Sequence, residues 1–507
     1  MARLMKNLNN VEVFFFCKTI FNIKWLRYDI IYNNVRGYYM ENTSKKKNLR
    51  LYDNNIMKGL LLLSLPIMLN NIIKALNDFV DTFMVSKIVD LPEIVSAQIS
   101  SIGFVAPIMS MCQALAIGLM TAGAALMSQY VGAKKDDKAS VISGQLLVLC
   151  AVVGLLFNIL LYILAPGILK LMNATGYLYK YSLSYLRIRS FEMSALFMFY
   201  AYQATRQSQG DTVTPVIINV SSILLNIIFT ALFIMVFNLG VAGAAIGTVI
   251  GNVAVIPVCL IHMAKSKKIK LTKDTVKPNF HYSKKIFLFG IPAAIAQAST
   301  SLGFLIINGM MAGYDQTILT PITIGNRINS MLLLPVMGIG TVLATFVGQN
   351  IGAENIARAK KTFVTSIKLS LIITIAGAGL IFPLREALAK IFLTQTPEIK
   401  ICVKYLNYLM FGLPLMGLFQ CINGVFQGAG RTELVLILAA TRLWIFRIPL
   451  FILMLNVFDV GYQAVWINMV ISNFGAIVLG FILYTFVDYR PKINKMHQKI
   501  KQEINNA

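Results

Sequence analysis

Polar and charged side chains recur along one apolar stretch of the chain, between residues 70 and 81. Their spacing of three or four residues would place them on one face of a helix. They are Asn70, Lys74, Asn77, Asp78 and Asp81. Because an ionisable side chain is expensive to expose to lipid, such a face must line a cavity or contact other protein groups. A carboxyl group there changes its protonation state when its neighbours or its hydration change. Such a carboxyl group is the minimal machinery for coupling a proton to a conformational switch.

Two further apolar stretches carry uncharged polar stripes with helical spacing. The first stripe is Asn219, Ser222, Asn226 and Thr230, and the second is Thr248 and Asn252. If these faces meet the stripe at 70–81, their amide and hydroxyl groups would form a wet pocket that is rich in oxygen atoms.

Three of the charged residues admit two interpretations each. Asp81 lies 21 residues beyond Leu60, about 31 Å along a helix, so it lies either in the pocket or at the outer membrane interface. Lys74 either forms an internal ion pair or substitutes for a coupling cation by holding Asp78 or Asp81 ionised. Glu192 either supplies a second coupling acid or pairs locally with Arg189.

The chain as a whole is too apolar to cover itself in water. Its 507 residues are 57% hydrophobic and 13% charged, with a mean hydropathy of +0.69, whereas a soluble domain carries roughly 25% charged residues. The run 146–165 has the length of about 20 residues that crosses a bilayer. Lipid admits only helices and closed barrels, and long unbroken apolar runs favour helices. These features predict an all-α polytopic membrane protein.

The net charge of +25 is concentrated in a few segments, of which 264–285 holds eight Lys. The segments 41–58 and 488–507 are also basic. Short loops that we expect on the other side of the membrane carry acids, namely 87–93, 312–317 and 456–461. This asymmetry predicts that both termini and the 264–285 loop are cytoplasmic. The sequence contains no nucleic-acid recognition motif, so we expect no nucleic-acid partner.

A short string recurs 220 residues later in the chain. "SQYVGA" (128–133) returns as "GQNIGA" (348–353), and "QSQGDT" (207–212) returns as "QGAGRT" (427–432) at the same offset. The segment 241–252 falls within a residue of alignment with 460–473. These coincidences predict an internal duplication, with two six-helix lobes related by a pseudo-two-fold axis along the membrane normal.

About twelve transmembrane helices are expected. Their approximate ranges are 56–86, 96–131, 138–166, 178–206, 212–238, 241–264, 284–313, 319–351, 361–383, 398–428, 432–456 and 461–487. The predicted domains are an N-terminal extension (1–55), a first lobe (56–264), a basic linker (265–283), a second lobe (284–487) and a basic tail (488–507). We expect the natural start at Met40 and little order before it.

Several longer strings resemble the multidrug and toxic compound extrusion (MATE) family. They are "DFVDTFMVSKI" (78–88), "ATRQSQGDTVTPVIINVSSILLNIIF" (204–229), "LGVAGAAIGTVIGN" (239–252), "GNRINSMLLLPVMGIGTVLATFVGQNIGAENIARAKK" (325–361) and "RLWIFRIPLFIL" (442–453). The resemblance covers roughly residues 56–487 and is strongest to the branch of DNA-damage-inducible protein F. The glutamate that the NorM-like branch carries in the seventh helix would fall at Thr300.

The resemblance implies a V-shaped cavity and the export of organic cations or amphipathic drugs, driven by inward flow of H⁺ or Na⁺. It implies cation coupling in the first lobe, at the positions Asp81, Asn226, Thr230, Thr248 and Gln203. A Na⁺ ion would bind at Asp81, Asn226 and Thr248, with no other metal or cofactor. The family's second coupling carboxylate is replaced by Thr230, a departure that puts tight Na⁺ binding in doubt. Lys74, Asn77, Asp78 and Glu192 would modulate the site. In the second lobe, the resemblance singles out Arg327, Arg442 and Arg447.

Two other classes of function compete with drug efflux. The wider superfamily also contains flippases for lipid-linked molecules, which share the two-lobed plan. An integral-membrane enzyme is disfavoured because the three histidines lie in loops or in the tail and no nucleotide-binding loop occurs. The sequence therefore predicts a transporter with no catalytic residues, monomeric, in a bacterial cell membrane, with small drug molecules and the lipid bilayer as its partners.

Overall fold

The structure is a computed structural model that describes residues 55–86, 91–311, 316–393, 395–458 and 460–493. The predicted start at Met40, the extension up to residue 54 and most of the predicted tail lie outside these residues. Residues 60–507 belong to one compact unit. The described residues are helical almost throughout and contain no strand. The predicted all-α fold is therefore confirmed.

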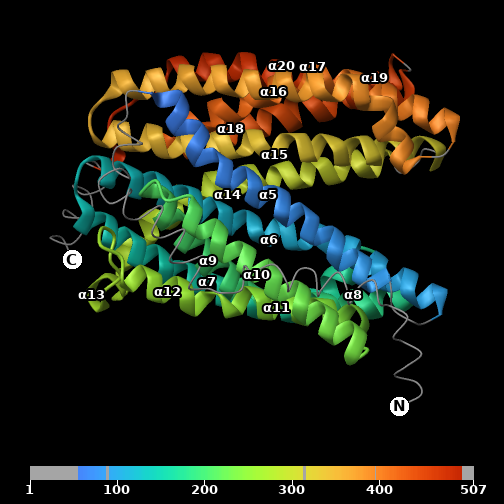
Figure 1. Cartoon of the computed structure of the whole chain (residues 1–507), viewed down its shortest axis with the longest axis horizontal. Coiled ribbons are helices and arrows are strands. Elements are labelled where there is room, and N and C mark those ends of the chain that lie inside the picture. Colours follow the sequence, from blue (N-terminus) through green and yellow to red (C-terminus); the bar gives the residue numbers. More distant parts are fainter. Residues whose placement is uncertain (1–54, 87–90, 312–315, 394, 459, 494–507) are drawn as a thin grey trace. The chain divides into compact units, whose positions relative to one another are not determined.

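The first lobe runs from α5 to α12 (Figure 1). Its helices are α5 (Ile56–Ser86), α6 (Pro92–Gly132), α7 (Asp136–Leu171), α8 (Gly176–Ser190), α9 (Glu192–Ser208), α10 (Val213–Ala231), the π-helix η4 (Leu232–Val236), α11 (Gly240–Ala254) and α12 (Ile256–Ala264). The short helix α13 (Lys273–Val276) lies in the predicted linker.

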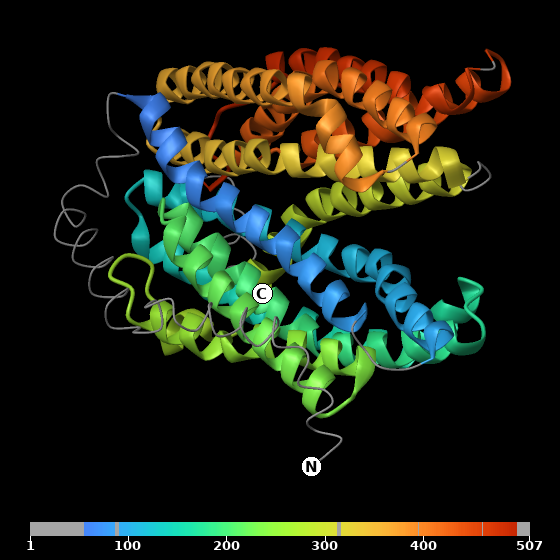
Figure 2. The same cartoon turned by 45° about the vertical axis from the view of Figure 1, so that its right-hand side comes forward.

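The second lobe runs from α14 to α20. Its helices are α14 (Phe280–Met311), α15 (Gln316–Gly352), α16 (Ile356–Phe392), α17 (Thr396–Gly428), α18 (Thr432–Ala440), the π-helix η5 (Thr441–Arg447), α19 (Ile448–Asn456), the 3₁₀ turn η6 (Gly461–Gln463) and α20 (Ala464–Thr485). Helices α15, α16, α17 and α20 pack side by side in both views (Figures 1 and 2).

Eleven helical segments of the described chain are long and apolar enough to cross a membrane. The twelfth predicted span, 178–206, is the pair α8 and α9. It is interrupted at Phe191, and it carries Arg187, Arg189 and Glu192 near the break. Because these charges need protein partners in lipid, the break marks a place where polar groups are held inside the lobe.

One predicted helix end is wrong by nine residues. The range 361–383 ends at a proline, but α16 continues through Pro383 to Phe392. Proline lacks an N–H group and usually ends a helix in water. In a membrane helix, neighbouring groups can satisfy the freed carbonyl, so the helix continues past the proline.

The repeated strings lie against each other where the lobes meet. A Cβ atom on Gly132 would lie 2.0 Å from the carbonyl oxygen of Gln349, and one on Gly352 would lie 1.9 Å from that of Gln129. The side chain of Gln129 donates to the Gly428 carbonyl, and that of Gln349 donates to the Ser208 carbonyl (3.3 and 2.6 Å). Each of these four contacts has its counterpart 220 residues away. This reciprocity is what a two-fold relation between the lobes produces.

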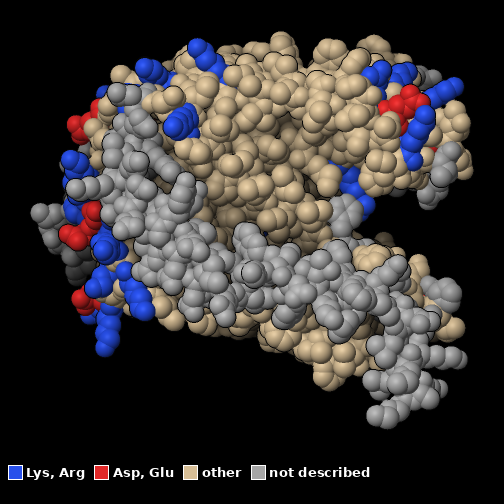
Figure 3. All heavy atoms as spheres, in the orientation of Figure 1, with Lys and Arg blue, Asp and Glu red and all other residues tan. Residues whose placement is uncertain are grey.

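The linker is held against the first lobe by one buried amide. Gln145 of α7 donates to the carbonyls of Thr275 and Lys277 (2.9 and 2.7 Å) and accepts from the Asn279 amide (2.8 Å). Figure 3 shows Lys and Arg side chains at the end of the molecule that contains α12 and α13, and a second group, with acidic side chains among them, at the upper right. The end that contains α12 and α13 is the predicted cytoplasmic one, and its orientation stays a prediction.

Candidate functional site

The centre of the candidate site is an amide held between two hydroxyl groups. Asn226 of α10 donates from Nδ2 to Thr248 Oγ1 (2.9 Å) and to Thr230 Oγ1 (3.3 Å). The Thr248 hydroxyl donates in turn to the Ala244 carbonyl (3.0 Å). Both amide protons of Asn226 are therefore directed at oxygen atoms. Its Oδ1 atom remains buried without a hydrogen-bond partner, so it is a free acceptor for a proton donor or a cation.

Glycines of α11 allow this close contact. A Cβ atom on Gly247 would lie 2.4 Å from Thr230 Oγ1, and one on Gly251 would lie 2.7 Å from the Ser222 carbonyl oxygen. Small residues four apart let two membrane helices approach until their backbones touch. The glycines of "AAIGTVIGN" (244–252) thus bring α11 against the polar stripe of α10.

Glu192 connects the helix break to both polar stripes. Its Oε1 atom accepts from Arg189 Nη2 (2.7 Å), and its Oε2 atom accepts from Asn252 Nδ2 (3.3 Å). Asn252 Oδ1 accepts from the Ser222 hydroxyl (3.0 Å). Glu192 is 1% exposed. It therefore forms the predicted local ion pair and also belongs to the network of α10 and α11.

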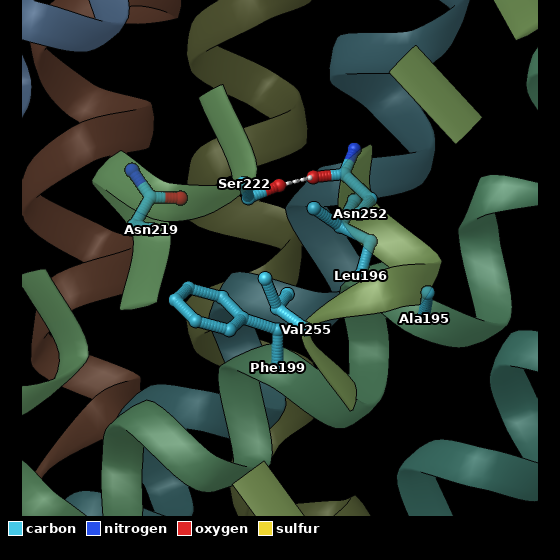
Figure 4. A pocket seen from close by; sticks show the side chains of 7 residues that line it. All are labelled: Ala195, Leu196, Phe199, Asn219, Ser222, Asn252 and Val255. Carbon is cyan, nitrogen blue, oxygen red and sulfur yellow. Dashed lines mark hydrogen bonds between the residues drawn. The ribbon is translucent and has the colours of Figure 1, made fainter. Parts of the chain in front are cut away.

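A small cavity opens beside this network (Figure 4). Its polar lining comes from Asn219, Ser222 and Asn252, and the rest of its wall is apolar: Ala195, Leu196, Phe199 and Val255. The volume of about 20 Å³ is enough for a single water molecule. Drug-sized ligands need pockets of roughly 300 Å³ or more. The cavity therefore suits a water molecule or a bare ion and cannot hold a drug.

The stripe on α5 meets polar groups of the first lobe at two levels. Asn70 Oδ1 accepts from Asn219 Nδ2 (2.8 Å). Asp81 is 9% exposed, and its carboxylate interacts electrostatically with Arg189 and Tyr185 of α8. Asp81 therefore lies within electrostatic reach of Arg189.

The remaining predicted residues of α5 are placed less centrally. Asn77 is half-buried and its Oδ1 atom has no hydrogen-bond partner, while Lys74 is exposed. The side chain of Asp78 lies outside the described residues.

Gln203 does not join the network. It is half-buried on α9 and makes no hydrogen bond to Asn226, Thr230 or Thr248 among the described residues. It lies eleven residues beyond Glu192, which is about 16 Å along the helix. The acid of α9 that does reach the network is Glu192, near the opposite end of that helix.

The sequence stripes of α10 and α11 included Ser222 and Asn252, but nothing in the sequence linked them to Glu192. The only available signal was an acid in an apolar span whose nearest positive charge lies three residues away.

The second lobe contains two buried arginines in the helix that corresponds to α10 of the first lobe. Arg442 and Arg447 are 4% and 5% exposed and lie in the π-helix η5. Arg442 Nη1 contacts Met416 Sδ (3.4 Å), and its guanidinium lies over the Phe419 ring (4.1 Å). Arg447 donates to Ser472 Oγ (3.0 Å) and Asn473 Oδ1 (2.9 Å). Neither arginine forms an ion pair with a carboxylate of the described chain. The third predicted arginine, Arg327, is exposed.

The contacts of Arg442 do not offset the free-energy cost of burying its charge. Burying an ion costs several kcal/mol even after the protein relaxes. A desolvated cation over an aromatic ring gains about 2 kcal/mol. The ring therefore offsets only part of the burial cost.

The π-helix shifts the register of the internal repeat. A π turn inserts one extra residue into a helix, so at the last residue of η5 the offset between the lobes becomes 221, and Arg447 corresponds to Asn226. The first-lobe π-helix η4 lies beyond Asn226, and after it the sequence still aligns Asn252 with Asn473 and Gly251 with Ser472 at an offset of 221. Gly251 lies against Asn226 in the first lobe, and Ser472 accepts a hydrogen bond from Arg447 in the second. An arginine thus takes the place of the central amide.

Among the described residues, no three His, Cys, Asp or Glu side chains come together in a metal-binding group. A Na⁺ ion would instead depend on the amide, hydroxyl and carboxylate oxygens of the first lobe. Hard cations take such oxygen ligands.

Comparisons with known proteins agree with this architecture. The MatE family model matches residues 66–232 and 292–453, one segment in each lobe. The "Probable multidrug resistance protein YpnP" of Bacillus subtilis is 25% identical over 397 residues, 78% of this chain and 87% of that protein. The "Multidrug export protein MepA" of Staphylococcus saprophyticus is 23% identical over 86% of this chain and 95% of its own length.

Two solved structures share the fold. One is the "Outward-facing conformation of a multidrug resistance MATE family transporter of the MOP superfamily", with a TM-score of 0.79 at 21% identity, covering 89% of this chain and 98% of that one. The other is a MOP superfamily transporter from Pyrococcus furiosus, with the same score, identity and coverage. The relatives do not separate the branches of the family, so the predicted branch stays a prediction. Because the family model matches more than half of the chain and the solved structures share its two-lobed fold, the chain belongs to the multidrug and toxic compound extrusion (MATE) family of transporters.

Proposed function

We propose that this chain is a secondary active antiporter that exports organic cations or other amphipathic drugs in exchange for H⁺ or Na⁺ by alternating access. The observation that carries the proposal is a buried network in the first lobe that joins acids, amides and hydroxyls. Glu192 is hydrogen-bonded within it, and Asp81 lies beside it. The cavity beside the network has room for an ion or a water molecule and for nothing larger.

The proposed coupling step depends on the charge of Asp81 and Glu192. With both carboxylates ionised, Glu192 pairs with Arg189, and Asp81 adds a second negative charge within electrostatic reach of that pair. A proton or a Na⁺ ion that enters the network would neutralise negative charge there, and its departure would restore that charge. The free Oδ1 atoms of Asn226 and Asn77 would accept a hydrogen bond from a protonated carboxyl group or ligate a cation. Packing of α10 and α11 would then differ between the loaded and the empty network.

Substrate would bind elsewhere. The first-lobe cavity is too small for a drug, so drug and coupling ion would occupy separate sites in this proposal. The protein would act as a monomer in a cell membrane, with both termini on the cytoplasmic side. The alternative is a flippase or an exporter of a lipid-linked metabolite. The buried cations Arg442 and Arg447 favour that alternative, because an anionic head group would compensate their charge.

The test is efflux of ethidium from cells and from proteoliposomes with an imposed H⁺ or Na⁺ gradient. We expect Asp81→Asn to lower the gradient-driven rate at least about tenfold, because a neutral amide cannot take part in a charge cycle of this kind. Asp274→Asn, at an exposed acid of α13, serves as the matched control and should transport like the wild type. Full gradient-driven efflux by Asp81→Asn, or no dependence of the wild type on either gradient, would refute the proposal.

A further inference from the structure

We propose that Arg442, Arg447 and Asn473 form a binding site for a small inorganic anion, such as chloride, inside the second lobe. The site is distinct from the cation-coupling network and does not depend on which drug is exported. It rests on three features of the region: uncompensated charge, unused hydrogen-bond donors and the geometry of the π-helix.

The first feature is the sign of the charge. Both guanidiniums are buried, and the groups in contact with Arg442 are a methionine sulfur and a phenylalanine ring. Arg447 contacts a hydroxyl, an amide oxygen and, more distantly, the ring of Phe304 (5.6 Å). All of these groups are neutral. In the first lobe, by contrast, half-buried Arg189 has the carboxylate of Glu192 at 2.7 Å.

The second feature is an excess of donors. Arginine has no acceptor atom, so Asn473 must turn its oxygen towards Arg447, which leaves its Nδ2 atom directed elsewhere. That Nδ2 atom and Arg442 Nε are both buried without a partner, as is Trp466 Nε1. In η5 and α20, the buried unpartnered side-chain atoms are these three donors and one acceptor, Asn468 Oδ1. An anion accepts hydrogen bonds from such donors, whereas a cation would be repelled.

The third feature is the π-helix itself. Residues five apart are hydrogen-bonded neighbours along a π turn, and Arg442 and Arg447 have this spacing. Two buried like charges are therefore carried on adjacent turns of one helix. A single anion near both guanidiniums would offset the repulsion between them, which accounts for a geometry that otherwise concentrates positive charge.

The experiment measures thermal stability of the purified full chain in detergent as sodium gluconate is replaced by sodium chloride at constant ionic strength. A ligand that binds only the folded state raises the melting midpoint in a saturable way. We expect a rise of about 3 °C or more in the wild type at a hundredfold excess over Kd. Arg442→Met should lose this dependence, and Arg442→Lys, which keeps the charge, should retain it.

The matched control is Arg385→Met on α16. Arg385 also lies over an aromatic ring, that of Phe382 at 4.0 Å, but it is outside η5. This variant should respond to chloride like the wild type. An equal response of Arg442→Met and wild type would overturn the proposal, as would equal midpoints of the wild type in gluconate and chloride.

A binding measurement covers the case in which Arg442→Met does not fold. Equilibrium dialysis of the wild type and Arg442→Lys with radioactive chloride should show saturable binding, and its absence would overturn the proposal. A third arm adds an alkyl carboxylate. If only this amphiphile and not chloride stabilises the wild type, the inorganic anion is the wrong ligand.

Discussion

The two lobes carry different polar and charged side chains at equivalent positions of the internal repeat. Ser222 of the first lobe corresponds to Arg442 of the second, and Asp211 corresponds to Arg431, both at the offset of 220. In the first lobe, half-buried Arg189 pairs with the buried carboxylate of Glu192. The second lobe carries two buried arginines without a described carboxylate partner. Duplication kept the backbone plan, while the polar groups diverged in sign.

The two lobes also differ in how closely the paired helices approach. Gly247 and Gly251 let α11 lie against α10 with almost no intervening side chain. At the equivalent positions of α20 stand Asn468 and Ser472, and both bind Arg447. In the first lobe, the backbones of the two helices are in direct contact. In the second lobe, side chains fill the space between the equivalent helices.

The strongest test of this difference enlarges a glycine of the first lobe. We expect Gly251→Leu to separate α10 from α11, because its Cβ alone would lie 2.7 Å from the Ser222 carbonyl oxygen. Overpacking of this kind costs about 3 kcal/mol, and the melting midpoint should fall by several degrees. Gly377→Leu on α16 makes the same change where nothing lies within 4 Å, and its midpoint should stay close to the wild type. Equal losses would show that the α10–α11 contact is not special.

The next test removes the charge of Arg447, whose side chain lies between η5 and α20 in the second lobe. Arg447→Met leaves Asn473 Oδ1 and the Ser472 hydroxyl without their donor, and unsatisfied buried groups cost about 1–3 kcal/mol each. Loss of an uncompensated buried charge offsets part of this cost. We expect a net loss of about 1–2 kcal/mol in thermal stability, measured as the melting midpoint in detergent. Gradient-driven ethidium efflux per folded molecule should fall less than in Asp81→Asn. A larger transport defect than that of Asp81→Asn would contradict the division of roles between the lobes.

The smallest effect is expected at the N-terminal end of α18, where Arg431 stands at the position that Asp211 occupies in the first lobe. Arg431 pairs with Asp488 (2.5 Å), and a hydrogen bond from the Arg490 amide together with the Arg431 charge holds the pKa of Asp488 below its ordinary value. A carboxyl group whose pKa is lowered by folding stabilises the folded state at every pH above its ordinary pKa of about 3.9. This stabilisation is lost as the pH falls through the lower pKa that the group has in the folded protein. Because the pair is partly exposed, Asp488→Asn should cost less than about 1 kcal/mol at pH 7.

The midpoints of wild type and Asp488→Asn should begin to converge as the pH falls below about 4 and should meet once the pH lies below the lowered pKa of Asp488 in the folded protein. The first-lobe counterpart, Asp211→Asn, should cost more, because Asp211 is buried, pairs with Arg206 and accepts from the Thr214 amide (3.1 Å). A larger loss at Asp488 than at Asp211 would reverse the comparison.

The sequence predicted the spans and part of the site because both depend on local periodicity. Asn226, Thr230 and Thr248 were expected together, and the structure joins them by hydrogen bonds. The repeat at an offset of 220 predicted the two lobes, and the reciprocal contacts of Gln129 and Gln349 confirm it.

What could not be predicted depends on helix rotation and on irregular turns. Gln203 and Glu192 lie on the same helix. The position of each residue along that helix and the rotation of the helix about its axis decide that Glu192 reaches Asn252. The break at Phe191 sets that direction, and no proline or glycine marks it. The π turn of η5 shifts the repeat by one residue, so an alignment at constant offset places Phe446 instead of Arg447 opposite Asn226.

The junction of Gly132 and Gly352 has one more consequence. Each glycine meets the glutamine carbonyl of the other copy, so the surface is self-complementary in the way that the interface of a symmetric homodimer is. A half-length ancestor with a single such helix would already have possessed both sides of this contact. A connecting peptide between residues 264 and 280 would be enough to join two such halves into one chain.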